Sequence, residues 1–224
     1  MALSYGPSII TDGLVLCLDA GDGLSYPGTG ATWTDLSGRG NHGTLVNGVG
    51  YNEKSLVFDG VNDYIASFPS QLSGIGSNTI NVWFKTMITS RNGLCGTRQS
   101  SANTGWVLTV NINAAGNLTY FHTGGSILEV AAGITTNTWY CATSTYDVSS
   151  ATVKLYINGN QIGASSSFST IASSTFNGVI GAEDENFNTE FLSGSISQVS
   201  IYNKALTASE IQQNFNSLRG RFGV

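Results

Sequence analysis

The chain is short of charge. Only 10% of its 224 residues are charged and just nine are basic, against about a quarter charged in an average soluble protein. The net charge is −5 and the isoelectric point about 4.8. Nine scattered basic residues form no cluster that could follow a phosphate backbone, so we expect no nucleic-acid partner. Solubility must then come from serine, threonine, asparagine and glycine.

Cysteines and long apolar runs are also scarce. The three cysteines are widely spaced and form no CxxC pair, so we expect neither a disulfide framework nor a zinc site. Cys17 and Cys141 fall inside strand-like segments and should be buried small side chains. No apolar run approaches the roughly 20 residues that span a bilayer, which predicts no membrane insertion. The first residues lack the pattern of a secretory signal, which predicts synthesis in the cytoplasm.

What the chain has in abundance is apolar segments of strand length, each bounded by Gly, Asn, Ser or Asp. They recur about every ten residues, which is typical of a sandwich or barrel of antiparallel strands. A chain of 224 residues fits one domain of this kind, so we expect a single domain over 1–224. The segments are 13–20, 55–58, 64–68, 79–85, 106–112, 118–122, 127–131, 139–146, 152–157 and 194–202.

Turn signals support this all-β reading. The stretches 35–44 and 56–65 are rich in Gly and Asn, which supply the positive φ angles of tight turns. Asn158-Gly159, between two strand-like runs, predicts a hairpin with a type I′ turn.

One helix is predicted, near the C-terminus. Thr207 and Glu210 form a capping box, and Leu206 with Ile211 can form a hydrophobic staple. Apolar side chains at 211, 215 and 218 share one face, so the helix should lie against the sandwich. Residues 1–10 and 219–224 are then expected to be terminal arms.

A loop from Asp35 to Asn41 offers oxygen ligands to a cation. Asp35, Ser37 and Asn41 stand at or near alternate positions in a glycine-rich loop, which suits calcium. Arg39 lies mid-loop and would repel the ion. The alternative is that these side chains bond the amides of their own turn. Asp59 and Asp63, four residues apart, invite the same two interpretations.

Signals of catalysis are weak. Residues 38–43 spell GxGxxG, but no strand–helix context surrounds them, so we take the match as chance. The acidic cluster 183–185, with Glu190 beyond, lies near the spacing of glycosidase carboxylates, yet it has the sequence of a loop and should be solvated. His42 and His122 lack a nucleophile partner and are expected in a turn or at the surface.

A glycan-binding face is predicted from strand parity. In 79–85, Ile80, Val82 and Phe84 alternate toward the core, which leaves a polar and aromatic set on the other face. The same parity in 153–158 gives a second set. Aromatic rings beside amide and ammonium donors suit a sugar. Alternatively, a second layer or the C-terminal helix covers these rings. The candidate residues are Asn81, Trp83, Lys85, Lys154, Tyr156 and Asn158.

Several blocks together resemble the laminin-G-like, concanavalin A-like family. They are WTDLSGRGNHG (33–43), FDGVNDY (58–64), WYCATSTY (139–146) with LYING (155–159), and GSISQVSIYNKAL (194–206). The resemblance implies an all-β jelly-roll sandwich of two antiparallel sheets with one short C-terminal helix, often calcium at a loop rim, and glycan or protein binding. Enzymes of this fold use a Glu-x-Asp-x-x-Glu array that the cluster at 183–185 does not reproduce.

The flanks 10–20 and 214–223 further resemble versions of this domain found in virion proteins of tailed bacteriophages. We therefore expect a non-enzymatic virion protein, either a capsid decoration or a tail-associated adhesion module, displayed in several copies and binding a host-surface glycan. Phe222 and Arg219 are the predicted contacts with neighbouring subunits. The alternatives are a carbohydrate-binding module of a bacterial surface or secreted protein, located outside the cell, and, more remotely, a glycan hydrolase.

Overall fold

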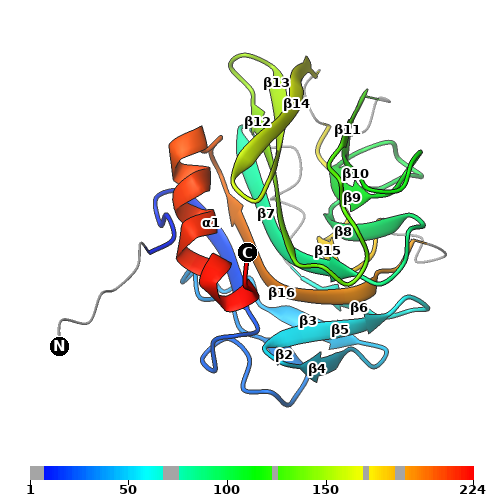
Figure 1. Ribbon diagram of the computed structural model, residues 1–224, viewed down its shortest axis with the longest axis vertical. Helices are drawn as coiled ribbons and strands as arrows, with labels where there is room; N and C mark the ends of the chain where they lie inside the picture. Colours follow the sequence, from blue (N-terminus) through cyan, green and yellow to red (C-terminus); the bar gives the residue numbers. More distant parts are fainter. Residues whose placement is uncertain (1–7, 68–75, 123–125, 169–171, 185–189) are drawn as a thin grey trace.

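The computed structural model describes residues 8–67, 76–122, 126–168, 172–184 and 190–224. Within these residues the chain forms two antiparallel sheets of eight strands each and one helix, which confirms the predicted sandwich (Figure 1). Sheet A has the order β14-β13-β12-β7-β16-β5-β4, with β1 also paired to β16, and sheet B the order β11-β10-β9-β8-β15-β6-β3-β2. The strands of sheet A are β1 (Leu14–Asp19), β4 (Gly50–Asn52), β5 (Ser55–Asp59), β7 (Asn78–Thr86), β12 (Tyr140–Asp147), β13 (Thr152–Ile157), β14 (Asn160–Ser167) and β16 (Ser193–Tyr202). Those of sheet B are β2 (Thr32–Trp33), β3 (Gly43–Val46), β6 (Tyr64–Ala66), β8 (Asn92–Gly96), β9 (Trp106–Val110), β10 (Asn117–His122), β11 (Ser126–Ala131) and β15 (Val179–Ile180).

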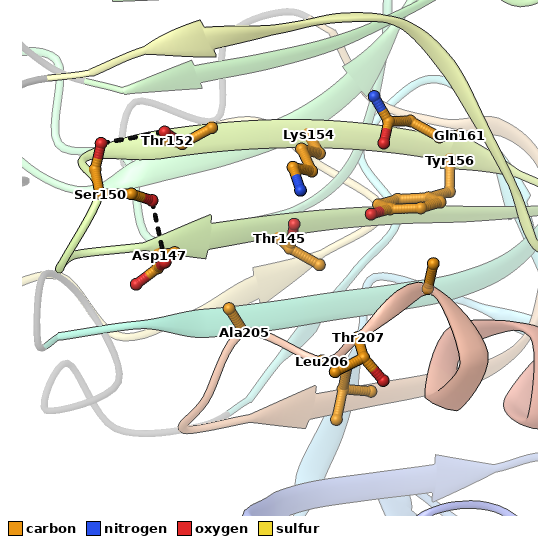
Figure 2. A pocket seen from close by; sticks show the side chains of 11 residues that line it. Thr145, Asp147, Ser150, Thr152, Lys154, Tyr156, Gln161, Ala205, Leu206 and Thr207 are labelled. Carbon is orange, nitrogen blue, oxygen red and sulfur yellow. Dashed lines mark hydrogen bonds between the residues drawn. The ribbon is translucent and has the colours of Figure 1, made fainter.

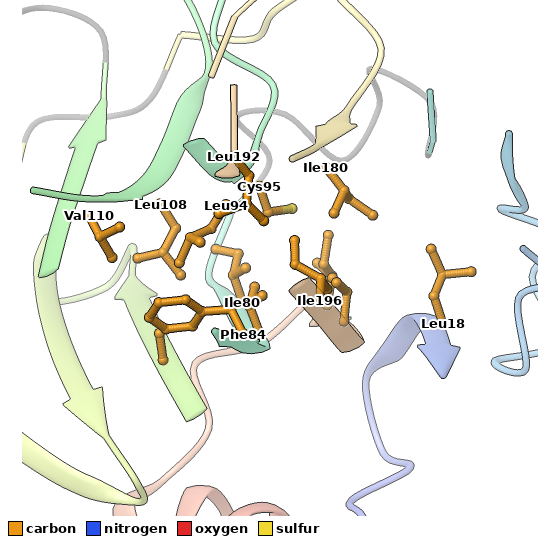
Figure 3. Packing of buried hydrophobic residues seen from close by; sticks show 14 of the residues in the cluster. Leu18, Ile80, Phe84, Leu94, Cys95, Leu108, Val110, Ile180, Leu192 and Ile196 are labelled. Atoms are coloured by element: carbon orange, nitrogen blue, oxygen red, sulfur yellow. The ribbon is translucent and has the colours of Figure 1, made fainter. Parts of the chain in front are cut away.

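The hydrophobic core lies between the two sheets. Alternate side chains of β7 point into it as predicted, and Ile80, Val82 and Phe84 are fully buried. Figure 3 shows side chains of β8 and β9 meeting those of β7 and β16 across this layer. The labelled core residues are Leu18, Ile80, Phe84, Leu94, Cys95, Leu108, Val110, Ile180, Leu192 and Ile196. All three cysteines are buried, and none forms a disulfide.

The predicted hairpin is confirmed. Asn158 and Gly159 have φ angles of 50° and 79°, so both central positions of the turn are left-handed. This geometry matches the twist of β13 and β14, which pair on either side of it.

The helix α1 (Ala208–Phe222) begins at the predicted capping box. Glu210 N–H donates to Thr207 Oγ1 at 3.3 Å, and Thr207 N–H donates to Glu210 Oε2 at 2.7 Å. The helix ends at Gly223, whose φ of 70° is left-handed. No helix in the described part of the chain has the length and hydrophobicity needed to cross a membrane.

The last turn of α1 corrects one expectation about the termini. Residues 219–222 are helical rather than a free arm. Arg221 donates to both carboxylate oxygens of Asp19, at 2.5 and 3.0 Å, and so fastens the end of α1 to the end of β1. Residues 1–7 of the predicted N-terminal arm lie outside the described residues.

Candidate functional site

The predicted sugar-binding face around Trp83 is covered. Trp83 points away from the core between the sheets, and Asn81 lies on the same face, as the alternation in 79–85 predicts. However, α1 packs on that face, and the Trp83 ring, with 0% exposure, lies against Phe222 at 4.1 Å and Phe215 at 5.6 Å between ring centroids. Of the two alternatives, coverage by the C-terminal helix is the one observed for Trp83, and Asn81 is buried as well.

Asn81 and two further predicted residues, Lys85 and Asn158, have structural partners. Asn81 Oδ1 accepts hydrogen bonds from Thr143 Oγ1 at 2.7 Å and Cys141 Sγ at 3.1 Å. The Lys85 ammonium lies 5.5 Å from the centroid of the Trp139 ring, and Asn158 Oδ1 accepts the Cys141 N–H at 2.9 Å. These contacts hold β7, β12 and the β13–β14 turn together.

Phe222, one of the two predicted subunit contacts, takes part in packing within the domain. Its ring stacks on Trp83 and lies 4.9 Å from Trp139 between ring centroids, and its side chain remains part-exposed. Arg219 is exposed, and its guanidinium lies 6.0 Å from the centroid of the Phe215 ring. Contact of these two residues with a neighbouring subunit stays a prediction.

The two remaining predicted residues, Lys154 and Tyr156, line a pocket of about 260 Å³ (Figure 2). The pocket lies where the outer face of β12 and β13 meets the connection from β16 to α1. Its floor combines the Tyr156 ring with Leu206, and its sides carry hydroxyl, amide, ammonium and carboxylate groups. The lining residues are Thr145, Asp147, Ser150, Thr152, Lys154, Tyr156, Gln161, Ala205, Leu206, Thr207 and Ala208.

The pocket has one charge of each sign. Asp147 accepts hydrogen bonds from Ser149 and Ser150, at 2.8 Å from each hydroxyl, and these bonds lower its pKa below the usual value. Lys154 is exposed and forms no ion pair within the described residues. Burial raises the pKa of Tyr156, which keeps its hydroxyl protonated, while a hydrogen bond with Thr145 opposes the rise. The pocket therefore offers both donors and acceptors at neutral pH.

The loop at Asp35 is a self-bonded turn. Asp35 Oδ1 accepts the N–H groups of Cys17 and Ser37, each at 2.9 Å. Its Oδ2 accepts Ser37 Oγ at 2.7 Å and Asn41 N–H at 3.0 Å. Because four donors face this buried carboxylate, the arrangement of Asp35, Ser37 and Asn41 does not fit a calcium ion.

The acidic cluster is not the solvated loop that was expected. Glu183 is 1% exposed and pairs with Arg91, whose Nε donates at 2.6 Å, and with Arg98 at 3.5 Å. Arg98 also reaches Asp184 at 2.5 Å. Burial raises the pKa of Glu183, and the bond from Arg91 opposes that rise. Glu185 lies outside the described residues, so the Glu183–Glu185 pair has no measured separation.

Only one of the two histidines lies where the sequence predicts. His42 belongs to the turn, and its Nδ1 accepts the Asp35 N–H at 3.0 Å. His122 is fully buried rather than at the surface, with its ring 4.9 Å from that of Phe168. Among the described residues, no group of three or more His, Cys, Asp or Glu side chains is placed to hold a metal ion.

Most of the pocket was missed by sequence reasoning. The available signal was parity, since Thr145 and Asp147 alternate on β12 as Thr152, Lys154 and Tyr156 do on β13. Pairing of Thr145 with Lys154 places the two rows side by side. The helix side of the pocket comes from residues 205–208, about fifty positions further along the chain, and no local pattern reveals that contact.

Comparisons with known proteins agree with the fold. Residues 59–212 match the model of a laminin G-type family described as the concanavalin A-like lectin/glucanases superfamily. A Trypanosoma rangeli sialidase structure superposes with a TM-score of 0.70 at 16% identity, covering 99% of this chain and 36% of the sialidase. The binding domain of botulinum neurotoxin serotype D gives 0.69 at 19% identity, covering 92% of this chain and 52% of that one. This chain thus spans about a third to a half of these proteins. A search of curated proteins found no match.

Proposed function

We propose, from the premise that this chain belongs to the concanavalin A-like lectin/glucanases superfamily, that it is a non-catalytic carbohydrate-binding domain. One observation carries the proposal: a cationic donor, hydroxyl groups and an apolar floor converge in the pocket of Lys154, Tyr156 and Leu206. A sugar ring presents both hydroxyls and apolar C–H faces, which such a lining can satisfy together. At about 260 Å³ the pocket is smaller than the roughly 300–1,000 Å³ of sites that enclose drug-sized ligands, so it suits one ring or the end of a glycan.

The non-catalytic part of the proposal is supported by the state of the carboxylates. Glycosidases need two carboxyl groups flanking one bond, with separate roles as acid and base or nucleophile. Glu183 is instead buried against Arg91 and Arg98, and Asp184 is paired with Arg98. Asp147, in the pocket, is occupied by serine donors. None of these groups resembles a poised acid and base pair.

The binding site is tested by glycan-array screening with the purified chain, followed by titration calorimetry on the strongest hit. Lys154→Ala removes the one ammonium group of the pocket and should weaken binding by about tenfold or more, as for a lost charged hydrogen bond. Arg39→Ala, which removes an exposed cation from the Asp35 loop, is the matched control and should bind normally. Equal affinity of the Lys154→Ala variant would contradict this assignment. Reducing-end release by the wild type, abolished in Glu183→Gln, would contradict the non-catalytic role.

Display on a bacteriophage particle is a second proposal and rests on the sequence resemblance of the flanks alone. Capsid decoration or tail-associated adhesion would place many copies side by side, so that weak glycan contacts add up to avidity. Arg219, which is exposed, and Phe222, which is part-exposed, are the predicted contacts to other virion subunits. Mass spectrometry of purified particles tests this placement, and absence of the protein from them would refute it. A leader peptide or a neighbouring catalytic domain encoded in the same gene would favour the alternative, a carbohydrate-binding module of a bacterial surface or secreted protein.

A further inference from the structure

A phenyl ring from the end of α1 lies on Trp83 in the place that a sugar ring could take. The Phe222 ring is nearly parallel to the indole, with planes at 15° and centroids 4.1 Å apart. The C–H groups of a pyranose pack against the face of an aromatic side chain in a similar way. Phe222 therefore stands where the apolar face of a sugar would stand.

The covered indole keeps an unused hydrogen-bond donor. Trp83 Nε1 is shielded from solvent and donates to no acceptor within the described residues. Buried tryptophan N–H groups usually find a partner, and a donor without one lowers stability. The side chains that cover the ring, Phe215 and Phe222, contain no acceptor, whereas a sugar hydroxyl would supply one.

The face of sheet A around Trp83 is polar, although it is covered. Gln198 lies opposite Trp83 on β16 and accepts the Asn81 amide at 3.2 Å, while Asn81 Oδ1 accepts the Thr143 hydroxyl at 2.7 Å. A surface shaped only to hold an amphipathic helix would be apolar. These uncharged amide and hydroxyl groups suit a neutral sugar.

The last turn of α1 is a weak piece of helix. Gly220 stands inside this turn, and a Cβ added there would meet nothing within 4 Å, so no contact requires a glycine. Glycine nevertheless disfavours the helix about fivefold relative to alanine, which corresponds to about 1 kcal/mol. One of the tethers of the turn is the ion pair of Arg221 with Asp19, which remains partly open to solvent.

We propose that residues 219–222 form a gate over a second carbohydrate-binding site, centred on Trp83. When this turn unwinds, Phe222 leaves the indole, and a neutral pyranose stacks in its place with a hydroxyl accepting the Trp83 N–H. A sugar that binds only the open form shifts the population toward it. The proposal rests on carbohydrate binding as the function of the domain. It does not involve the pocket, which lies at the other end of α1, where Leu206 and Ile211 are buried.

The test is binding to an array of neutral oligosaccharides, with Lys154→Ala in every variant so that the pocket contributes least. Phe222→Ala removes the covering ring and should bind its strongest array sugar about tenfold or more tightly than the Lys154→Ala parent. Adding Gly220→Ala to Phe222→Ala strengthens the last turn and should weaken that binding by up to about fivefold. Gly23→Ala is the matched control, since its Cβ also meets open space but lies outside α1, and it should change nothing.

Tryptophan fluorescence locates the binding. Trp33 and Trp106 are 0% exposed in the core between the sheets, and Trp139 is part-exposed. With Trp139→Phe added, Trp83 is the one tryptophan that a sugar can reach in Phe222→Ala. Titration with the strongest array sugar should then change the emission of Phe222→Ala and leave that of its parent unchanged.

The gate is overturned if folded Phe222→Ala binds no array sugar more tightly than its parent, or if the sugar leaves the Trp83 emission unchanged. Should Phe222→Ala fail to fold, Phe222→Leu replaces it, because leucine keeps an apolar side chain but not the stacked ring. Failure of the gate leaves the pocket standing, since Lys154→Ala in the otherwise wild-type chain decides that assignment. A gain in Phe222→Ala with no effect of Lys154→Ala would refute the pocket alone.

Discussion

Replacing Phe215 with alanine tests how firmly α1 is attached to sheet A. The ring is 6% exposed and lies nearly parallel to Trp83, with centroids 5.6 Å apart and planes at 10°. Deleting a buried aromatic ring from such a position costs about 3–5 kcal/mol. For a domain of this size each kcal/mol lowers the melting temperature by about 2–4 °C, so a fall of about 6–20 °C is expected.

The assay combines melting followed by circular dichroism with tryptophan fluorescence. Removal of Phe215 opens one side of the Trp83 ring to water, so the emission should shift to longer wavelength. Arg219→Ala is the matched control, because the side chain of Arg219 is exposed and its guanidinium lies 6.0 Å from the centroid of the same ring. Such an exposed cation–π contact is worth about 0.5–1 kcal/mol. An unchanged melting temperature with unchanged emission in Phe215→Ala would refute the packing of α1 on Trp83.

Two further predictions concern the turns and the helix cap. Gly105→Ala should be far more destabilising than Gly30→Ala: both have positive φ, but a Cβ on Gly105 overlaps a backbone carbonyl and one on Gly30 meets open space. Gly30→Ala should lower the free energy of unfolding, measured by thermal melts, by about 1 kcal/mol. Equal losses of stability in Gly105→Ala and Gly30→Ala would contradict this geometry. Glu210 has a lowered pKa, chiefly because its carboxylate accepts the Thr207 N–H. Its stabilisation is present above the unfolded pKa of about 4.3 and is lost as the pH falls through the lower folded value. The advantage of the wild type over Glu210→Gln should therefore shrink between pH 5 and pH 3, and a constant difference would argue against this contribution.

Much of the fold could be predicted because periodicity is a local property. The alternation in β7 and the capping box at Thr207 both appear in the sequence and are confirmed in the structure. The segment that became β8 was missed, because Asn92–Gly96 contains two glycines, an asparagine and a cysteine and lacks strand formers. It is a strand because β9 and β15 pair with it on both sides. The two-residue strands β2 and β15 are too short to carry any periodic signal.

The candidate sites were harder to predict, because their outcome depends on contacts across the chain. Parity placed Trp83 on the correct face, but it could not show that a helix more than 120 residues later covers the ring. The sequence predicts that the acidic loop is solvated, because the arginines that pair with it, Arg91 and Arg98, lie about 90 residues earlier in the chain. At Asp63 the sequence shows the carboxylate but not that Oδ2 accepts the Asp59 N–H while Oδ1 is buried without a donor.

The connection that leads into α1 lines the pocket, so the proposed glycan binding should be coupled to docking of the helix that covers Trp83. The connection before α1 is held by Thr79, whose hydroxyl donates to the Lys204 carbonyl and accepts the Leu206 N–H, each at 2.8 Å. Leu206 is thereby fixed next to Tyr156 in the apolar floor of the pocket. Loosening α1 through Phe215→Ala should consequently weaken glycan binding as well as stability, although Phe215 does not line the pocket. A sugar that binds the pocket only when α1 is docked should, by the same linkage, raise the melting temperature of the Phe215→Ala variant.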